Sequence, residues 1–132
     1  MIRRIAYVSR PRAGMSLTEL PRIVAACRAH NEIDRITGVL LFTGLDFAQL
    51  IEGAPEPVER LWARLLDDDR HEGILRLLDT RADSRWFADW RVGFPSERAF
   101  VDRIAQWRAQ GPRGPCADPD GVLRLFTEAD AM

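Results

Sequence analysis

Three polar side chains occupy positions where the surrounding pattern predicts an apolar interior. Tyr7 lies in the run RIAYVS, Gln49 interrupts the apolar run FAQLI, and Asn31 ends a helical apolar pattern. A buried polar group without a partner costs about 1–3 kcal/mol, so each of the three needs a hydrogen-bonding partner. A phenol and a primary amide can both donate and accept hydrogen bonds. The three side chains could therefore satisfy one another or bind a polar ligand, and their types alone leave both interpretations open.

Asn31 also has a simpler interpretation, as a helix C-cap or turn residue, and His30 beside it is typical of a solvated helix end. A second cluster is charged and closes a later predicted helix: Arg64, Asp68, Arg70 and His71. Such a run of charges usually forms a solvated face. Acidic residues are nevertheless unfavourable beside the negative end of a helix, which suggests another reason for their presence.

Several common chemistries lack the residues that they need. All 19 basic residues are arginine, which excludes lysine Schiff bases and the lysine of a phosphate-binding loop. The two histidines and two cysteines do not have the spacing of a metal site. Cys27 falls on an apolar helix stripe, where a thiol is usually inert. Ser9 lacks the strand-to-helix elbow of a hydrolase nucleophile.

The elements that must position these residues follow from the periodicity of the apolar residues. Alternation predicts strands, and spacings of three and four residues predict helices. The spacing of Ser16 and Glu19 is that of a capping box at the start of the first helix. The predicted strands are 2–9, 36–43, 47–52, 74–79 and 89–94, with a hairpin turn at 44–46. The predicted helices are 17–29, 58–68, 97–110 and 118–129.

This order predicts a ferredoxin-like α+β fold of the type βαββαββ, with two helices on one sheet face and two further C-terminal helices. The first and third strands are central neighbours in such a sheet, so Tyr7 and Gln49 should meet on the helix-covered face. We predict a domain over residues 1–95 and a helical extension over residues 96–132 that packs on it. The apolar stripe of that extension, which contains Ile104, either caps the far face of the sheet or forms an output surface.

The composition of the chain limits its possible binding partners and its cellular compartment. A chain of 132 residues suits one core. The net charge of -1, with both signs mixed along the chain, argues against direct binding of nucleic acid. The longest apolar run is too short to span a bilayer, and the N-terminus lacks the features of a signal peptide. Two cysteines imply no disulfide framework. We therefore expect a cytoplasmic protein without a membrane partner.

Six motifs, taken together, resemble the BLUF family of blue-light sensors that use flavin. The resemblance runs from residue 2 to residue 94. Its motifs, in order, are YVS at 7–9, HN at 30–31, ITG at 36–38, FAQLIEG at 47–53, DDRH at 68–71 and RWFADWRVGF at 85–94.

The resemblance implies that a flavin ring is bound non-covalently between the first two helices, over the central strands. Ile23 and Leu65 then match the apolar positions that sandwich the ring. Asn31 matches the amide that forms hydrogen bonds with its pyrimidine edge. The remaining residues that the resemblance assigns to the flavin site are His30, Gln49, Arg64, Asp68, Arg70 and His71. FAD is the usual flavin of the family, although a site that binds the ring alone would also accept FMN or riboflavin.

The resemblance also implies a photochemical rather than an enzymatic function. Tyr7 matches the tyrosine that gives an electron and a proton to the excited flavin, and Gln49 matches the glutamine between them. Charge recombination would then leave a rearranged Gln49 side chain, by rotation or tautomerisation, with altered hydrogen bonding to the flavin.

The last strand departs from the family, which usually has a methionine two residues after the strand tryptophan. Here Val92 follows Trp90 at that spacing. We expect both residues to relay the signal and the valine to alter dark recovery. No catalytic domain follows in this sequence, so we expect a stand-alone sensor that acts through a downstream protein partner or as a homo-oligomer. The alternatives are a photochemically inactive flavin- or protein-binding module and, less well supported, an acylphosphatase-like hydrolase.

Overall fold

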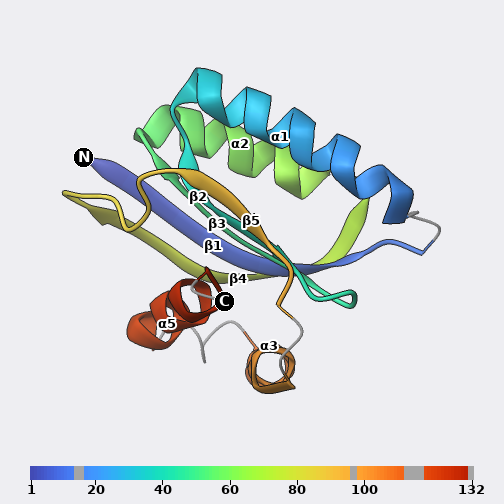
Figure 1. Cartoon of the computed structure of the whole chain (residues 1–132). Helices are drawn as coiled ribbons and strands as arrows, with labels where there is room; N and C mark the ends of the chain where they lie inside the picture. The colour runs from blue at the N-terminus through green and yellow to red at the C-terminus, as the bar shows by residue number, and fades with distance from the viewer. Residues whose placement is uncertain (14–16, 96–97, 112–117, 131–132) are drawn as a thin grey trace.

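A five-stranded sheet with helices against both of its faces forms the centre of the molecule (Figure 1). The computed structural model describes residues 1–13, 17–95, 98–111 and 118–130. The strands are β1 (Ile2–Pro11), β2 (Thr37–Phe42), β3 (Phe47–Gly53), β4 (His71–Ala82) and β5 (Trp90–Gly93). The helices are α1 (Leu20–Asp34), which follows a 3-10 turn (Leu17–Glu19), α2 (Pro55–Asp67), α3 (Arg98–Gln110) and α5 (Pro119–Asp130).

The strand order β4-β1-β3-β2-β5 places β1 and β3 side by side in the middle of the sheet. All pairs are antiparallel except β5, which runs parallel to β2. Helices α1 and α2 cover one face, and α3 and α5 cover the other (Figure 1). The predicted ferredoxin-like α+β fold with two additional C-terminal helices is confirmed.

The first helix differs from its prediction at both ends. Ser16 of the predicted capping box lies outside the described residues, and Glu19 occupies the N-cap position without a side-chain hydrogen bond to the backbone. The helix then continues to Asp34 and ends at Arg35, which adopts the left-handed conformation with φ 55°. The predicted end at residue 29 is therefore wrong. Asn31 is not a C-cap, because it lies inside the last turn of the helix.

The starts of α2 and β4 also lie before their predicted positions. Helix α2 starts at Pro55, where proline is favoured because the first helical N–H has no intrahelical partner. Strand β4 starts at His71 rather than at residue 74, and its pairing with β1 shifts register near Gly73. Such an irregularity hides the alternation from which a strand is predicted.

Gly38 joins β2 to both of its neighbours in a way that only glycine allows. Its φ of 143° disfavours any side chain, and a Cβ there would lie 1.9 Å from the Leu50 carbonyl oxygen of β3. On the other side, its N–H donates to the Asp89 carbonyl oxygen at the start of β5. The glycine thus permits the close approach that holds β3, β2 and the residues before β5 together.

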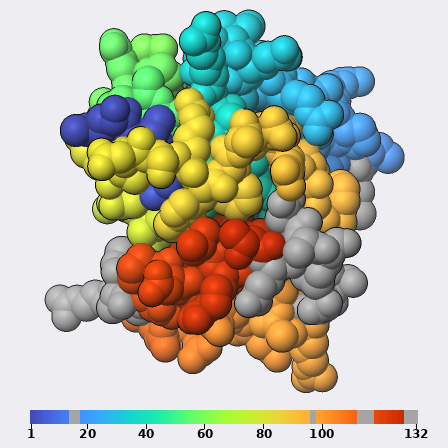
Figure 2. All heavy atoms as spheres, turned by 60° about the vertical axis from the view of Figure 1, so that its left-hand side comes forward, coloured from blue at the N-terminus to red at the C-terminus, as the bar shows by residue number. Residues whose placement is uncertain are grey.

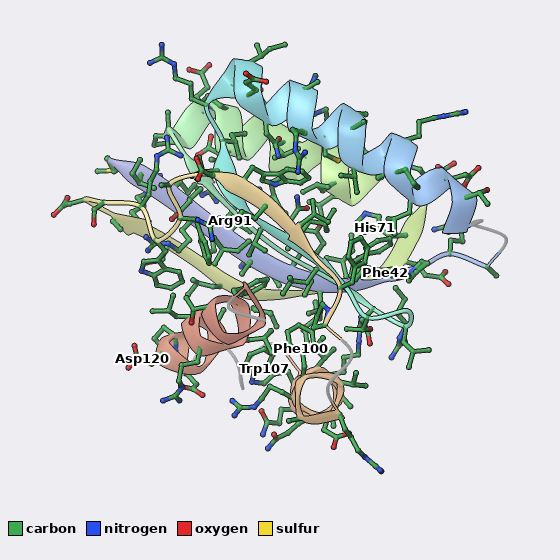
Figure 3. All side chains as sticks on the ribbon, viewed as in Figure 1. Phe42, His71, Arg91, Phe100, Trp107 and Asp120 are labelled. Carbon is green, nitrogen blue, oxygen red and sulfur yellow. The ribbon has the colours of Figure 1, made fainter. Side chains whose placement is uncertain are left out.

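Separate apolar clusters lie on the two faces of the sheet. Beneath α2, the buried residues are Ile5, Ile36, Ile51, Val58 and Leu61. On the opposite face, α3 and α5 complete the largest cluster, and Phe100 and Trp107 of α3 extend toward the sheet (Figure 3). Helix α5 also lies against β5 and the β4–β5 connection (Figure 2). The C-terminal segment therefore covers the far face of the sheet, while the predicted division of the chain at residue 95 stays a prediction. No helix in the described part of the chain is both long enough and apolar enough to span a bilayer.

Candidate functional site

The side chains of Tyr7 and Gln49 meet in the middle of the face covered by α1 and α2. Successive strand residues point to opposite faces, and these two residues are direct partners in the β1–β3 register. The Tyr7 hydroxyl donates to Gln49 Oε1 at 2.5 Å, and each residue is only 3% exposed. Burial is the main cause that raises the pKa of Tyr7, and Cys27 and Asp68 add to it. The phenol therefore stays protonated and acts as a donor, and the expected meeting of the two residues is confirmed.

Two adjoining cavities open beside this pair, between the two helices and the sheet. The larger has a volume of about 330 Å³ and the smaller about 50 Å³. They share the lining residues Cys27, Gln49, Leu65, Asp68 and Arg70. Each residue predicted to contact a cofactor lines at least one of them: Ile23, His30, Asn31, Gln49, Arg64, Leu65, Asp68, Arg70 and His71. The structure thus brings together residues from α1, β3, α2 and the start of β4.

Asn31 lines the larger cavity and carries an unsatisfied donor. The residue is 2% exposed, and its side-chain Nδ2 has no hydrogen-bond partner in the described part of the chain. Buried polar atoms are nearly always paired, so an unpaired donor on a cavity wall indicates a missing acceptor. The Tyr7–Gln49 bond does not include Asn31, which argues against a polar network that satisfies itself.

Charged residues of α2 and the following turn form the outer part of the site. Arg64 contacts the His30 ring across the gap between α2 and α1. The Asp68 carboxylate accepts hydrogen bonds from the backbone N–H of Arg70 and from its guanidinium, at 2.6–3.1 Å. These bonds from Arg70 are the main cause that lowers the pKa of Asp68. Pairing with Arg70 explains why an acidic residue is tolerated at the end of α2.

His71 lines the smaller cavity but uses both ring nitrogens within the protein. Its Nε2 lies 2.6 Å from the Leu65 carbonyl oxygen, which can only accept, so Nε2 carries the proton. Its Nδ1 forms a second hydrogen bond, with the Ser9 hydroxyl 2.8 Å away. His71 consequently ties the end of α2 to β1 and β4, and only its ring carbons remain for a ligand.

Five lining residues were not predicted from the sequence: Ala26, Cys27, Leu40, Phe47 and Leu61. The spacing already contained a signal for two of them. Cys27 lies four residues from both Ile23 and Asn31, on the same helical face, and Leu61 lies four residues before Leu65. The other three required the strand register and the tilt of α1. The part of the chain that the structure describes contains no cluster of three or more His, Cys, Asp or Glu that could hold a metal ion.

The two residues predicted to relay a signal lie next to the site rather than in it. Trp90 packs against the apolar cluster of Leu40, Phe42 and Phe47, and its buried Nε1 has no partner among the described residues. Val92 is the register partner of Leu40, which is in turn the partner of Gln49. A single residue of β2, Leu40, therefore separates Val92 of β5 from Gln49.

Comparisons with known proteins agree with this geometry. The family model "BLUF: Sensors of blue-light using FAD" matches residues 2–93. The chain is 32% identical over 87 residues to the blue light- and temperature-regulated antirepressor BluF of Escherichia coli K12, which covers 66% of this chain and 22% of the relative. The chain thus spans about a fifth of that curated relative.

Two solved structures show how far the likeness extends. The dark-state structure of BlrB, described as a BLUF protein, matches with a TM-score of 0.73 and 27% identity, over 99% of this chain and 97% of that one. The structure of Klebsiella pneumoniae BlrP1 with FMN and cyclic diGMP matches with a TM-score of 0.67 and 25% identity. The match covers 96% of this chain and 31% of that one. The family match and the shared fold lead to one conclusion: the chain belongs to the BLUF family of flavin-binding blue-light sensors.

Proposed function

We propose that the chain binds its flavin non-covalently in the two adjoining cavities and uses Tyr7 and Gln49 as a light-triggered hydrogen-bond switch. One observation carries this proposal: the 2.5 Å Tyr7–Gln49 bond lies in the wall of the smaller cavity, and Gln49 also lines the larger one together with Asn31 and its unpaired Nδ2. Such an arrangement offers a ligand both an unused donor and an amide that can change partners.

The residues present fit a flavin. A volume of about 330 Å³ is typical of small-molecule sites. Ile23 of α1 and Leu65 of α2 provide apolar walls from two different helices. Asn31 would hold the polar edge of the ring, and Arg64 and Arg70 would place positive charge beside its oxygen atoms or a phosphate.

The switch follows from the chemistry of Tyr7 and Gln49. When bound, the flavin supplies the blue-light-absorbing ring, which takes up one electron on excitation and returns it during recovery. Tyr7 is the only tyrosine of the chain. Loss of an electron makes its phenol a far stronger acid, so its proton moves along the hydrogen bond to Gln49 Oε1. The protonated Gln49 amide can then rotate or tautomerise, and Tyr7 regains a proton as its electron returns.

We propose FAD as the bound flavin, because the matching family is described by that cofactor. The FMN in the BlrP1 structure supports a site that recognises mainly the ring. Flavin released by heat from the purified protein and separated by chromatography identifies which form is bound. A product that is entirely FMN or riboflavin would contradict the choice of FAD without affecting the switch.

Output is proposed to leave the site through β5 toward a separate protein or a second copy of the chain, without catalysis. Trp90 and Val92 would relay it, since β5 lies between α1 on one face and α5 on the other. One exchanged hydrogen bond is worth roughly 0.5–1.5 kcal/mol, enough to shift a two-state element about tenfold at most. Such a shift suits control of an association better than control of a large rearrangement. The cysteine content fits function in the reducing cytoplasm.

Colour and its response to light test the proposed function. Purified protein should be yellow, and blue light should shift its flavin absorption band reversibly to longer wavelength. Colourless protein that takes up no added FAD would overturn the proposal. Yellow protein without a light-induced shift would support the alternative, a flavin-binding module without photochemistry.

A further inference from the structure

Trp62 of α2 lies directly against Tyr7. The ring centroids are 5.5 Å apart and the ring planes are inclined at 54°. Trp62 is half-buried at the edge of the cluster around Ile5, and it does not line either cavity in the described part of the chain. A ligand in the cavities can therefore touch Tyr7 directly, whereas it communicates with Trp62 through Tyr7.

From this contact we propose that Trp62 is a second electron donor, which reduces oxidised Tyr7 and moves the oxidising equivalent toward the surface of α2. The inference rests on the proposed function, because light must first oxidise Tyr7. Its consequence is a side path: electron transfer from Trp62 competes with the direct return of the electron to Tyr7 that completes the switch.

The step balances in electrons and protons. Oxidised Tyr7 has lost one electron, and its proton lies on Gln49 Oε1. One electron passes from the Trp62 indole to Tyr7, and the proton returns from Gln49 Oε1 to the Tyr7 oxygen along the existing hydrogen bond. Tyr7 is restored as the neutral phenol, Gln49 as the neutral amide, and Trp62 is oxidised by one electron. Return of the electron first taken from Tyr7 then reduces Trp62.

Electrostatics favours Trp62 over the other three tryptophans as the place for a positive charge. An arginine guanidinium carbon lies over the ring of Trp86 at 3.8 Å, and others lie over Trp90 and Trp107 at 5.7 Å. A neighbouring cation raises the free energy of an oxidised indole. Trp62 is the one tryptophan without a guanidinium over its ring among the described residues. Its partial exposure also allows water to stabilise the charge.

Among the described residues, His71 is the other aromatic ring near Tyr7, at 6.0 Å between centroids. Imidazole is much harder to oxidise than indole, and both nitrogens of His71 are already hydrogen-bonded. The geometry therefore leaves Trp62 as the donor in contact with Tyr7.

A flash-quench experiment on the flavin-loaded full chain tests the inference. Ferricyanide added before a blue flash removes the electron that the ring has accepted, which traps the oxidised side chain for electron paramagnetic resonance. We expect a tryptophan radical in the wild type and a tyrosyl radical in Trp62→Phe, which keeps an apolar ring of α2 against Tyr7. The matched control Trp90→Phe should retain the tryptophan radical.

Two results would overturn the inference. One is a tyrosyl radical in the wild type that Trp62→Phe leaves unchanged. The other is a Trp62-dependent radical that persists in Tyr7→Phe, because Trp62 would then be oxidised without Tyr7. Failure of the proposed function is recognisable separately, because such a protein would lack the reversible absorption shift as well as every trapped radical.

Discussion

At the scale of single residues, the site combines one satisfied polar pair with one unsatisfied donor. Tyr7 and Gln49 satisfy each other at 2.5 Å, whereas Asn31 Nδ2 lacks a partner among the described residues. A self-sufficient core network would not leave a donor unpaired at a cost of about 1–3 kcal/mol. Asn31 is therefore the residue that distinguishes a binding site from an ordinary buried network.

Asn31→Leu should affect the empty and the flavin-loaded protein in opposite directions. Removal of an unpaired buried donor should leave the flavin-free protein as stable as the wild type or more stable. Loss of its bond to the ligand should weaken flavin binding by about 1–3 kcal/mol, or roughly 5- to 150-fold. Thermal unfolding and flavin titration measure the two effects. Glu32→Ala, at the exposed neighbouring position, is the control. If Asn31→Leu bound flavin as tightly as the wild type, Asn31 would not be part of the binding site.

The Asp68–Arg70 pair should make stability depend on pH at the acid end. Its hydrogen bonds lower the folded-state pKa of Asp68 below the ordinary value of 3.8 for an aspartate. The contribution is therefore present above the unfolded pKa and is lost as the pH falls through the folded one. Because the pair is partly exposed, it should contribute about 1 kcal/mol or less. Urea unfolding of wild type and Asp68→Asn should differ at pH 7 and converge near pH 2. An equal difference in the free energy of unfolding at pH 7 and at pH 2 would show that the Asp68–Arg70 pair is not its source.

At the scale of elements, strands were easier to predict than helix ends. Alternation placed Tyr7 and Gln49 on the same face because the strand period of two leaves little choice. The end of α1 was misjudged because His and Asn tolerate helical backbone, while Arg35 occupies a left-handed position where glycine is usual. The start of β4 was missed because the irregularity near Gly73 breaks the alternation. The cavity itself depends on how α1 and α2 tilt over the sheet, which periodicity does not encode.

Gly38→Ala should disrupt the centre of the sheet. A Cβ at this position would lie 1.9 Å from a backbone oxygen of β3, which cannot move away as a flexible side chain could. The forbidden backbone conformation alone costs about 1–3 kcal/mol. We expect the variant to unfold at much lower urea concentration or to be recovered unfolded. Gly44→Ala has positive φ but open space around its Cβ, so it should lose less stability. Equal losses would show that strain, not the clash, dominates.

At the scale of the whole molecule, one sheet carries the site on one face and the C-terminal helices on the other. Buried side chains of α3 and α5 complete the far-face cluster, and Ile104 at its centre is 0% exposed. The same sheet thus carries the Tyr7–Gln49 pair on one face and contacts the helical extension on the other. This arrangement gives a change at Gln49 a short physical path to the opposite surface.

Ile104→Ala should show that α3 belongs to the core rather than to a loose appendage. Deletion of a fully buried isoleucine side chain costs about 2–5 kcal/mol. Exposed Asp102→Ala on the same helix should change the free energy of unfolding by only about 0.5 kcal/mol. Both values come from urea unfolding of the full chain. A negligible effect of Ile104→Ala would indicate that α3 detaches without disturbing the sheet.

The light-minus-dark absorption spectrum of flavin-loaded Tyr7→Phe and Gln49→Leu tests the central claim most directly. Both substitutions leave a side chain of similar size in the cavity wall. Both variants should bind flavin, because Asn31 and the apolar walls are intact. We predict that the wild-type band shifts reversibly to longer wavelength and that neither variant shows this shift. A normal, reversible shift in either variant would show that the Tyr7–Gln49 hydrogen bond is not the switch.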